Sequence, residues 1–419
     1  MADAIIFISQ SYLQFATRQT LEMISDLTET VLILHDSETV DPFLKPFIKA
    51  VHHVPGSLNL SLRPALSHNE VKALVSGYAD RHGGPDRIRI FCQQEDNVEL
   101  AALIREELGI PGDRPGLVSA FRNKLVMKDR VSQHRPEALP AYAPFNQELC
   151  RADPARYFEL LHTHFGDKFV IKPTSAAGSF NVSIVESFDD FLHAWTLINE
   201  ESHDFEYEVN EFIDGKMYQC DSLVIDGKVY FSGILELGCS NFDFVQGKPL
   251  SVYPVTSQTL YDRLFAFNQD IISALGFANG STHHEIFQKS DGSLIFLEIA
   301  ARVPGGLGVP YHAANSSINL IDANLLLAIG RDIPRTIVPD MRNNVISALL
   351  PVGNGTIRAL NSPDIASRFT IDWYVKEGME VTSRSLVDSA GVLMAFNDNP
   401  DILRSDFEKL QQYVPVTCS

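Results

Sequence analysis

Two acidic residues, Glu285 and Glu298, lie at equal distances from the dipeptide Asp291-Gly292. Asp-Gly between two alternating apolar runs is typical of a tight hairpin, and a turn centred there places the glutamates opposite each other. Cross-strand partners have Cβ atoms about 4.5–5.5 Å apart, so two carboxylates repel unless a cation lies between them. The pattern therefore predicts a site for a hard cation such as Mg²⁺. The competing interpretation is a solvent-exposed strand pair whose polar face carries two glutamates.

A guanidinium group belongs to the same predicted surface. Arg302 lies four residues after Glu298, and the period of two along a strand puts both side chains on one face. Arg302 is followed by Pro304, Gly305 and Gly306, and the two glycines leave room for a substrate. Carboxylate and guanidinium groups therefore converge on one surface. In the competing interpretation, Arg302 only neutralises a glutamate.

A second group of residues has the composition of a phosphate-covering loop. A predicted strand ends near Lys172, a turn of small residues follows at 174–179, and the chain returns in a second strand at 182–185. Small side chains let backbone N–H groups approach an anion, and Lys172 adds a positive charge beside them. The pattern GxxxxGK[ST] occurs nowhere, so this is not a P-loop. The alternative is an ordinary hairpin turn with a lysine beside it.

Three further features are less specific. The strand end Glu211-Phe212-Ile213 combines polar and apolar residues, which can hold a flat heteroaromatic ring through backbone groups. Glu236 could receive a substrate ammonium group, and a surface glutamate is its alternative. Of the adjacent His283 and His284, one must face the site side of a strand. We expect His284 to orient substrate as a neutral hydrogen-bond donor, with a packed or solvated histidine as its alternative.

The elements that position these residues follow from hydrophobic periodicity. Short apolar runs alternate with helical stretches in the first part of the chain, which predicts βαβ units around a parallel sheet. No GxGxxG follows the first strand, so a dinucleotide site is not indicated. Strands and hairpins dominate from 168 to 302. The polar turn 315–317 is expected to cap the helix predicted over 318–329. The predicted segments are strands at 4–9, 31–35 and 87–92, and helices ending near 28 and spanning 97–108, 117–134, 154–165, 259–275 and 318–329.

The composition excludes several classes of protein. The chain has 419 residues, 34 basic and 53 acidic side chains, and a formal net charge of −19. This charge argues against binding nucleic acid or an anionic membrane through a basic surface. The five cysteines show no CxxC or Cys/His zinc pattern, and no apolar run approaches the roughly 18 residues of a membrane span. We expect a globular cytoplasmic protein.

Taken in order, the motifs resemble the ATP-grasp superfamily over residues 120–325. The chain looks most like its carboxylate-amine ligases, especially the bacterial L-amino acid ligases that make dipeptides. Lys124 matches the lysine of the family's DK segment, with Asn123 in place of the usual Asp. Asn181 stands where glycine is common, and Met217 where a ribose-binding acid is often found. The resemblance implies ATP binding by Lys124, Lys172, Ser175, Gly178, Ser179, Glu211, Phe212 and Ile213.

The same resemblance assigns roles at the acidic hairpin. Glu285 and Glu298 match the Mg²⁺ ligands of the family, which hold one or two ions, with Mn²⁺ as the alternative metal. Arg302 matches the arginine near the transferred phosphate. Arg302, Lys172 and Glu298 are therefore the implied catalytic residues, and Glu236, His284, Gly305 and Gly306 the candidate substrate contacts. Ala300 replaces the Asn of the common E-x-N-x-R pattern, a departure that resembles the amino acid ligase subgroup.

The implied fold is α/β, or α+β overall, with three parts. An N-terminal parallel-sheet α/β domain would span 1–116. The ATP-grasp domain would span 117–330, divided into subdomains 117–205 and 206–330. A C-terminal β-containing cap would span 331–419.

The implied activity is an ATP-dependent ligase. It would join an amino acid or related carboxylate to the amine of a second amino acid through an acyl phosphate, releasing ADP and phosphate, and a homodimer is expected. The alternatives are another ATP-grasp ligase or carboxylase, of the purine or biotin carboxylase type, and a nucleotide-binding regulator without catalysis. The departures at Asn123, Asn181 and Met217 allow the regulator, whereas the retained lysine, glutamates and arginine favour an enzyme.

Overall fold

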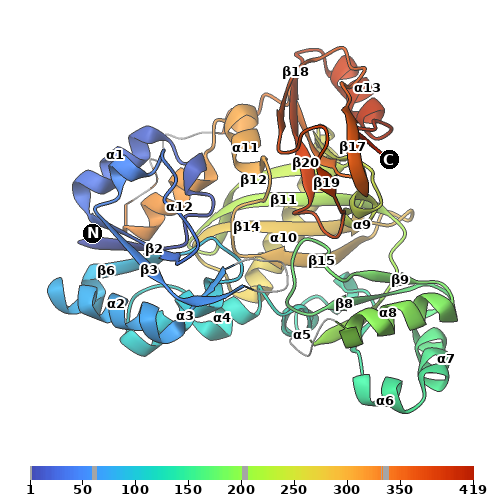
Figure 1. The fold of residues 1–419 in the computed structure, drawn as a ribbon, viewed down its shortest axis with the longest axis horizontal. Helices are drawn as coiled ribbons and strands as arrows, with labels where there is room; N and C mark the ends of the chain where they lie inside the picture. The colour runs from blue at the N-terminus through green and yellow to red at the C-terminus, as the bar shows by residue number, and fades with distance from the viewer. Residues whose placement is uncertain (1, 59–63, 201–205, 332, 334–338) are drawn as a thin grey trace.

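The computed structural model describes residues 2–58, 64–200, 206–331, 333 and 339–419. Near the N-terminus, four parallel strands form a sheet in the order β3-β2-β1-β6 (Figure 1). The predicted parallel sheet is thus confirmed. Its strands are β1 (Ala4–Ile8), β2 (Glu29–His35), β3 (Ala50–Val54) and β6 (Ile88–Phe91), and a small hairpin of β4 (Gly56–Leu58) and β5 (Pro64–Leu66) follows β3.

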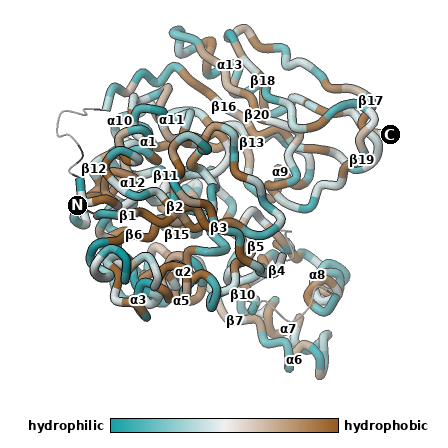
Figure 2. The backbone as a smooth tube through the Cα atoms, turned by 60° about the vertical axis from the view of Figure 1, so that its left-hand side comes forward, coloured by the Kyte–Doolittle hydropathy of each residue, from teal (hydrophilic) through white to brown (hydrophobic). Residues whose placement is uncertain are grey.

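Helices cover both faces of this sheet. Ile5 and Phe7 pack with residues of α1 and α12, whereas Ile6 and Ile8 pack with residues of α2 and α3. Because side chains alternate between the two faces, a strand covered on both sides is apolar throughout, as β1 is. Figure 2 shows β1, β2 and β6 as hydrophobic segments. The covering helices are α1 (Arg18–Leu27), α2 (His68–Arg81), α3 (Val98–Leu108) and α12 (Leu320–Ala328).

A second, antiparallel sheet has the order β7-β10-β8-β9. Three helices accompany it, and the aromatic side chains of Phe145, Phe169 and Phe191 lie in the core between them and the sheet. The helix predicted over 154–165 has these bounds in the structure. The strands are β7 (Tyr142–Pro144), β8 (Phe169–Pro173), β9 (Ser183–Val185) and β10 (Tyr207–Glu211), and the helices α6 (Gln147–Ala152), α7 (Pro154–Phe165) and α8 (Phe188–Glu200).

The largest sheet has eight strands in the order β15-β14-β11-β12-β13-β16-β20-β18 (Figure 1). The turn between β11 and β12 has positive φ at Asp226 (50°) and Gly227 (76°), as a tight hairpin requires. Helix α10 (Gln258–Leu275) packs on this sheet through Leu264 and Ile271. The strands are β11 (Lys216–Ile225), β12 (Lys228–Leu237), β13 (Leu250–Pro254), β14 (Gly280–Gln288), β15 (Leu294–Ala300), β16 (Val345–Pro351), β18 (Arg368–Trp373) and β20 (Ser389–Phe396).

The large sheet crosses one of the predicted domain boundaries. Strands β16, β18 and β20 follow residue 331 but extend the sheet that begins with β11 to β15. A second predicted boundary, at 205–206, adjoins residues 201–205, which lie outside the described residues. The remaining elements are α9 (Asn241–Val245), α11 (Gly308–Ser316), α13 (Pro400–Leu410), β17 (Gly355–Leu360), β19 (Glu380–Val381) and β21 (Val416–Cys418).

Two predictions about helices are wrong. The helix expected over 117–134 is divided into α4 (Pro115–Ser119) and α5 (Lys124–Ser132). Asn123 causes the new start, because its side chain accepts hydrogen bonds from the first N–H groups of α5. The helix predicted over 318–329, which is α12, is likewise capped by Asn319 and not by the turn 315–317, which lies at the end of α11. None of the described helices has the length and apolar character needed to cross a membrane.

Candidate active site

The two predicted metal ligands face each other across neighbouring strands. Glu285 of β14 is paired directly with Glu298 of β15. The turn is nevertheless longer than predicted, since only its glycine, Gly292, has a positive φ (85°) and the strands pair Phe287 with Ile295. A β-bulge beside Glu285 then restores the predicted register. The pairing of the glutamates is confirmed, but it results from two irregularities that offset each other.

Glu285 lies in a buried polar network. Its Oε1 accepts a hydrogen bond from Asn241 Nδ2 at 2.9 Å and lies 3.5 Å from His283 Nε2. His283 Nδ1 is 2.6 Å from the buried carboxylate of Asp221, whose other oxygen is 2.7 Å from His312 Nε2. Burial opposes the charged imidazolium, but Asp221 and Glu285 raise the pKa of His283 to about 9. Glu285 Oε2 is buried and has no hydrogen-bond partner among the described residues.

Glu298 lies beside lysines. Lys124, the first residue of α5, places its Nζ 3.3 Å from a Glu298 oxygen and donates to the carbonyl of Ala176 at 2.8 Å. Burial raises the pKa of the Glu298 carboxyl, but the positive charges of Lys124 and Lys172 outweigh it and lower that pKa. Glu298 is therefore an anion in a positive environment, whereas Glu285 is held by hydrogen bonds.

Lys172 belongs to a buried chain of charges. Its Nζ lies 3.7 Å from Glu208 Oε1, which accepts a shorter hydrogen bond of 2.6 Å from Lys128 Nζ. The side chains of Lys128 and Glu208 are both 0% exposed. Burial lowers the pKa of Lys128 to about 7 despite the Glu208 charge. Glu208 is therefore hydrogen-bonded to Lys128, and Lys172 is the more distant of its two lysines.

Residues 174–182, between β8 and β9, form the predicted loop. Gly178, Ser179 and Asn181 have positive φ values of 68°, 56° and 52°. Only glycine, asparagine and aspartate adopt this conformation routinely, so Asn181 is one of the few residues that can replace a glycine there.

Two contacts from other parts of the chain hold the loop. Arg122 Nη2 donates to the carbonyl of Ser175 at 2.8 Å. The backbone N–H of Leu386, from the C-terminal region, donates to the carbonyl of Gly178 at 3.0 Å. The contact of Leu386 was not predicted, because a backbone donor leaves no signal in residue type.

The loop, the lysines and the predicted ring-binding strand end at 211–213 line one cavity of about 940 Å³. This strand end is fixed by Glu211, whose N–H donates to the carbonyl of Ala141 at 2.8 Å and whose Oε2 accepts from Ala141 N at 3.1 Å. Lys168 lies 4.1 Å from the centre of the Phe212 ring. The other predicted residues on this wall are Lys124, Lys172, Gly178, Ser179, Ile213, Glu285 and Glu298. Ser175 lies on the loop but not on this wall.

Arg302 meets an acid that the sequence analysis missed. Its Nε and Nη2 both lie 2.9 Å from Oε2 of Glu95, and Arg122 Nη1 lies 2.6 Å from the other oxygen of the same carboxylate. Glu95 follows β6, 207 residues before Arg302. Burial opposes ionisation of Glu95, but Arg302 and Arg122 hold the pKa of its carboxyl far below the usual range. This arginine junction (Glu95, Arg122 and Arg302) joins the N-terminal sheet to the acidic hairpin.

A second cavity, of about 660 Å³, lies on the other side of the glutamates. Arg302, Gly305, Gly306 and His283 line it, together with residues of the N-terminal and C-terminal parts of the chain. The residues that line both cavities are Lys124, Gly178, Asn241, Glu285 and Glu298. The two spaces therefore meet at the paired glutamates.

Of the predicted substrate contacts, His284 is wrong and Glu236 already has another partner. The ring of His284 is 0% exposed, hydrogen-bonded to Asn268 and 5.4 Å from the ring of Phe296, so it faces the core and not the cavities. His283 takes the site face, as the period of two relative to Glu285 requires. Glu236 does line the nucleotide-sized cavity, but Arg404 binds both of its oxygens, at 2.9 and 3.2 Å.

The glutamate pair fits a magnesium ion. No group of three or more His, Cys, Asp or Glu residues arranged for a metal occurs in the described ranges. Mg²⁺ needs fewer protein ligands, because it keeps several waters and binds one or two carboxylates together with substrate phosphates. The unpartnered oxygen of Glu285 and the negative charge of Glu298 are of the chemical type it requires.

Known proteins share this architecture. Residues 165–311 match the family described as the ATP-grasp domain. The chain is 25% identical over 275 residues to an L-arginine-specific L-amino acid ligase of Bacillus subtilis, and the match spans 64% of each protein's length. It is 24% identical over 345 residues to dapdiamide A synthase of Enterobacter agglomerans, covering 77% of this chain and 78% of that protein.

Solved structures agree with the fold. The L-amino acid ligase from Bacillus licheniformis has a TM-score of 0.73 at 16% identity, over 100% of this chain and 99% of that one. N5-carboxyaminoimidazole synthetase from Staphylococcus aureus, complexed with ADP, has a TM-score of 0.66 at 13% identity, over 97% of both chains. At these identities the likeness establishes the fold and leaves the substrates open.

Proposed function

Because this chain contains an ATP-grasp domain and shares the fold of ATP-grasp ligases, we propose that it is an ATP- and Mg²⁺-dependent ligase that joins a carboxylate to an amine. The carboxylate would be an amino acid or a related acid, and the amine a second amino acid. The observation that supports this most is the meeting of two cavities at the Glu285–Glu298 pair. One cavity has the size and the lysines for ATP, and the other has Arg302 and room for the two substrates.

The first step makes the carboxylate reactive. A carboxylate is a poor electrophile, so one of its oxygens attacks the γ-phosphorus of ATP, the bond to the β-phosphate oxygen breaks, and an acyl phosphate and ADP form. Such a transfer needs positioning and charge stabilisation more than covalent chemistry from the protein. Lys124 and Lys172 would hold the phosphates. Glu285 and Glu298 would hold Mg²⁺, or Mn²⁺ in its place, and the ion would neutralise developing negative charge.

The second step forms the amide. The amine attacks the acyl carbon, the bond to the phosphate oxygen breaks, and the amine gives up a proton as phosphate leaves. Arg302 would stabilise the oxyanion, because its charge is fixed and its planar group matches a pair of oxygens. The arginine junction already orients it through Glu95. The loop with Ser175, Gly178 and Ser179 would exclude water from the acyl phosphate.

The remaining proposed binding residues line the two larger cavities. Glu211, Phe212 and Ile213 would hold the adenine ring, since they line the end of the larger cavity beside the antiparallel sheet. Gly305 and Gly306 would border the substrates in the second cavity. We carry neither His284 nor Glu236 into this proposal, because each has another partner.

The organisation of the protein is part of the proposal. We propose functional parts at 1–116, 117–330 and 331–419, with the last supplying the Leu386 contact to the phosphate loop. All five cysteines are free, which supports the expected cytoplasmic location. A homodimer remains a prediction.

The test is product formation from pairs of amino acids. ADP and phosphate release would be measured with Mg²⁺ and ATP against single amino acids and pairs, with mass spectrometry of the products. The proposal predicts release that depends on the pair, together with a new mass equal to the two substrates less one water. ATP binding without release for any pair, including pairs with non-amino carboxylates, would contradict it.

A further inference from the structure

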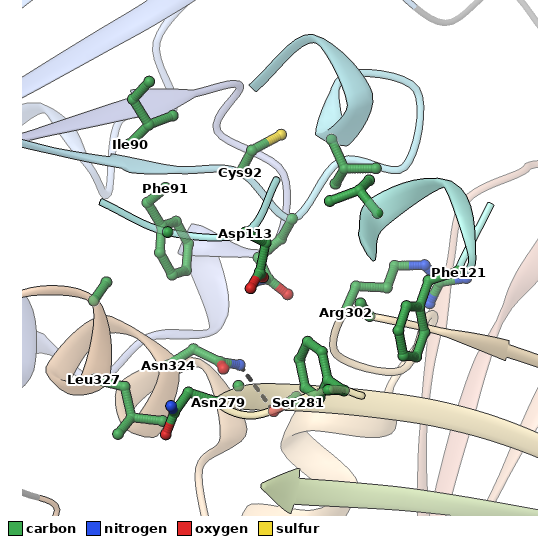
Figure 3. A pocket seen from close by; sticks show the side chains of 18 of the residues that line it. Ile90, Phe91, Cys92, Asp113, Phe121, Asn279, Ser281, Arg302, Asn324 and Leu327 are labelled. Atoms are coloured by element: carbon green, nitrogen blue, oxygen red, sulfur yellow. Dashed lines mark hydrogen bonds between the residues drawn. The ribbon is translucent and has the colours of Figure 1, made fainter. Parts of the chain in front are cut away.

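A third cavity, of about 300 Å³, lies behind the arginine junction and has no role in the proposed reaction. We call it the interdomain cavity. It is enclosed by β6, the segment between α3 and α4, the start of β14 and the helix α12 (Figure 3). Its volume suits a molecule much smaller than a nucleotide.

An acidic side chain lies at the centre of this cavity. Figure 3 shows the carboxylate of Asp113 pointing toward Asn279, Ser281 and Asn324 on the opposite wall. Asp113 forms no ion pair within the described part of the chain, and burial raises the pKa of its carboxyl although Arg105 opposes this effect. A partly buried carboxylate that forms no ion pair favours a ligand that brings a positive charge or a hydrogen-bond donor.

Two basic side chains of the same cavity, Arg89 and Arg105, also form no ion pair within the described residues. Within the described residues, Arg105 donates only to the backbone carbonyls of Asp113 and Ile90, and Arg89 only to those of Asp86 and Ile88. A guanidinium has five N–H donors, so each arginine retains donors for an anion. Burial lowers the pKa of both arginines, although the charge of Asp113 opposes this effect for Arg105 and that of Asp86 opposes it for Arg89.

Part of the wall is apolar. Phe91, Phe121, Phe277 and Leu327 line the cavity together with its polar and charged groups. The cavity therefore offers one acceptor for an ammonium group, donors for a carboxylate, and apolar surface for a side chain. We propose that the interdomain cavity binds a free α-amino acid as a zwitterion, its ammonium group on Asp113 and its carboxylate on Arg105, at a site separate from the reaction.

The position of the cavity links such a ligand to the proposed catalytic group. Glu95, Arg122 and Arg302 line both the interdomain cavity and the second of the larger cavities. An amino acid bound there lies against the ion pairs that orient Arg302. The site is thus placed to sense the supply of amino acids.

Calorimetry on the full chain without ATP or Mg²⁺ tests the proposal, so its result does not depend on turnover. The background is Leu349→Trp, which fills the second large cavity, because Leu349 lines that cavity and not this one. The probes are L-phenylalanine and L-leucine, with phenethylamine and 3-phenylpropionate as analogues that each lack one charge. We expect an amino acid to bind with one site, and each analogue at least about tenfold more weakly, since each loses a charge-assisted contact.

Two further variants locate the binding. Asp113→Asn removes the charge and Leu327→Trp fills the space, and each should weaken amino acid binding at least about tenfold. The control is Asp26→Asn, an exposed aspartate of α1 that does not line the cavity, and it should bind as the background does. Thermal melting and circular dichroism would verify folding. The proposal is overturned if no amino acid of a full panel binds the background protein, or if binding survives both cavity variants.

Discussion

The proposed phosphate end of the site, formed by Lys124, Lys172, Glu208 and Glu298, and the arginine junction use charge in opposite ways. At the phosphate end, Lys124 lies 3.3 Å from Glu298 and Lys172 lies 3.7 Å from Glu208. At the junction, Glu95 meets Arg122 at 2.6 Å and Arg302 at 2.9 Å. The first set consists of long contacts between charges, and the second of short hydrogen-bonded ion pairs.

The difference indicates which charges are available to ligands. A lysine ammonium can turn its three donors toward a phosphate, whereas a guanidinium in a short, two-point contact is held in place before substrate arrives. The phosphate end is therefore suited to an incoming charged group. The junction is suited to fixing Arg302 and to joining two parts of the chain. Each of the following variants alters one side of this comparison.

The largest effect is expected for Glu298→Gln. The change keeps the shape of the side chain but removes the charge proposed to bind Mg²⁺ and to pair with Lys124. We expect ADP release to fall by about a thousandfold or more, since loss of preorganised charge at a reacting centre costs on this scale. The measurement is coupled ADP release at saturating ATP, with circular dichroism to show an intact fold.

A matched control uses the other acid of the same cavity. Glu236→Gln removes a carboxylate that Arg404 already binds through both oxygens. We expect its turnover to change far less than that of Glu298→Gln. Equal losses in the two variants would show that any negative charge on this wall matters, and would remove the specific role of Glu298.

A change at the arginine junction should lower the stability of the fold more than it lowers the rate of the reaction. Glu95→Gln leaves two buried guanidinium groups with a neutral partner, and breaking a buried ion pair in this way costs about 3–5 kcal/mol. We expect the free energy of unfolding in urea to fall by this amount near neutral pH. Glu95→Asp, which keeps the charge but shortens the reach, is the companion variant and should lose less.

The same carboxylate predicts a dependence on pH. Arginines hold the pKa of Glu95 below its ordinary value of 4.5 in the folded protein. Stability from Glu95 is therefore fully present above pH 4.5 and is lost as the pH falls from there toward the folded pKa. The difference in unfolding free energy between the wild type and Glu95→Gln should be constant near neutrality and shrink in acid. A difference that grows on acidification would contradict this assignment.

The phosphate end could be read from the sequence to a large extent because its contacts are local or periodic. The glutamate pair follows from alternation about an Asp-Gly turn, and Lys172 from a strand that ends in small residues. The same period assigns His283, and not His284, to the face of Glu285. The sequence alone therefore argues against the predicted contact of His284 with substrate. The same period predicts that Phe296 shares the face of the glutamates, but the longer turn and the bulge shift its register and bring it to the core beside His284.

The junction could not be read from the sequence, because it forms only when distant segments meet. Glu95 reaches Arg302 across 207 positions, and neither hydrophobic periodicity nor turn chemistry connects a loop after β6 to the end of β15. Asn241 binds Glu285 across 44 positions for the same reason. In a single sequence, such acids and amides look like any polar residue of a loop.

A smaller effect is expected from the loop over the phosphates. Gly178 has a φ of 68°, and a Cβ there would meet only Leu386 at an ordinary 3.7 Å, so Gly178→Ala is penalised by backbone strain alone. That strain is about 1–2 kcal/mol, which corresponds to an increase of about tenfold in the KM for ATP. Asn181→Gly is the comparison, because both residues suit its φ of 52° and a change within about twofold is expected. Steady-state ADP release at varied ATP measures both, and an unchanged KM for Gly178→Ala would mean that the loop does not hold the nucleotide.

The smallest effect is expected at the departure from the family's DK segment. Asn123 caps α5 by accepting hydrogen bonds from Leu125 N at 3.0 Å and Val126 N at 3.2 Å, and aspartate caps a helix equally well. Asn123→Asp should therefore keep turnover within about twofold, whereas Asn123→Ala should lose about 1 kcal/mol of stability through the missing cap. Thermal melting and ADP release together separate the outcomes. If Asn123→Asp instead raised or abolished turnover, a negative charge beside Lys124 would affect phosphate binding. Helix capping would then not be the only role of residue 123.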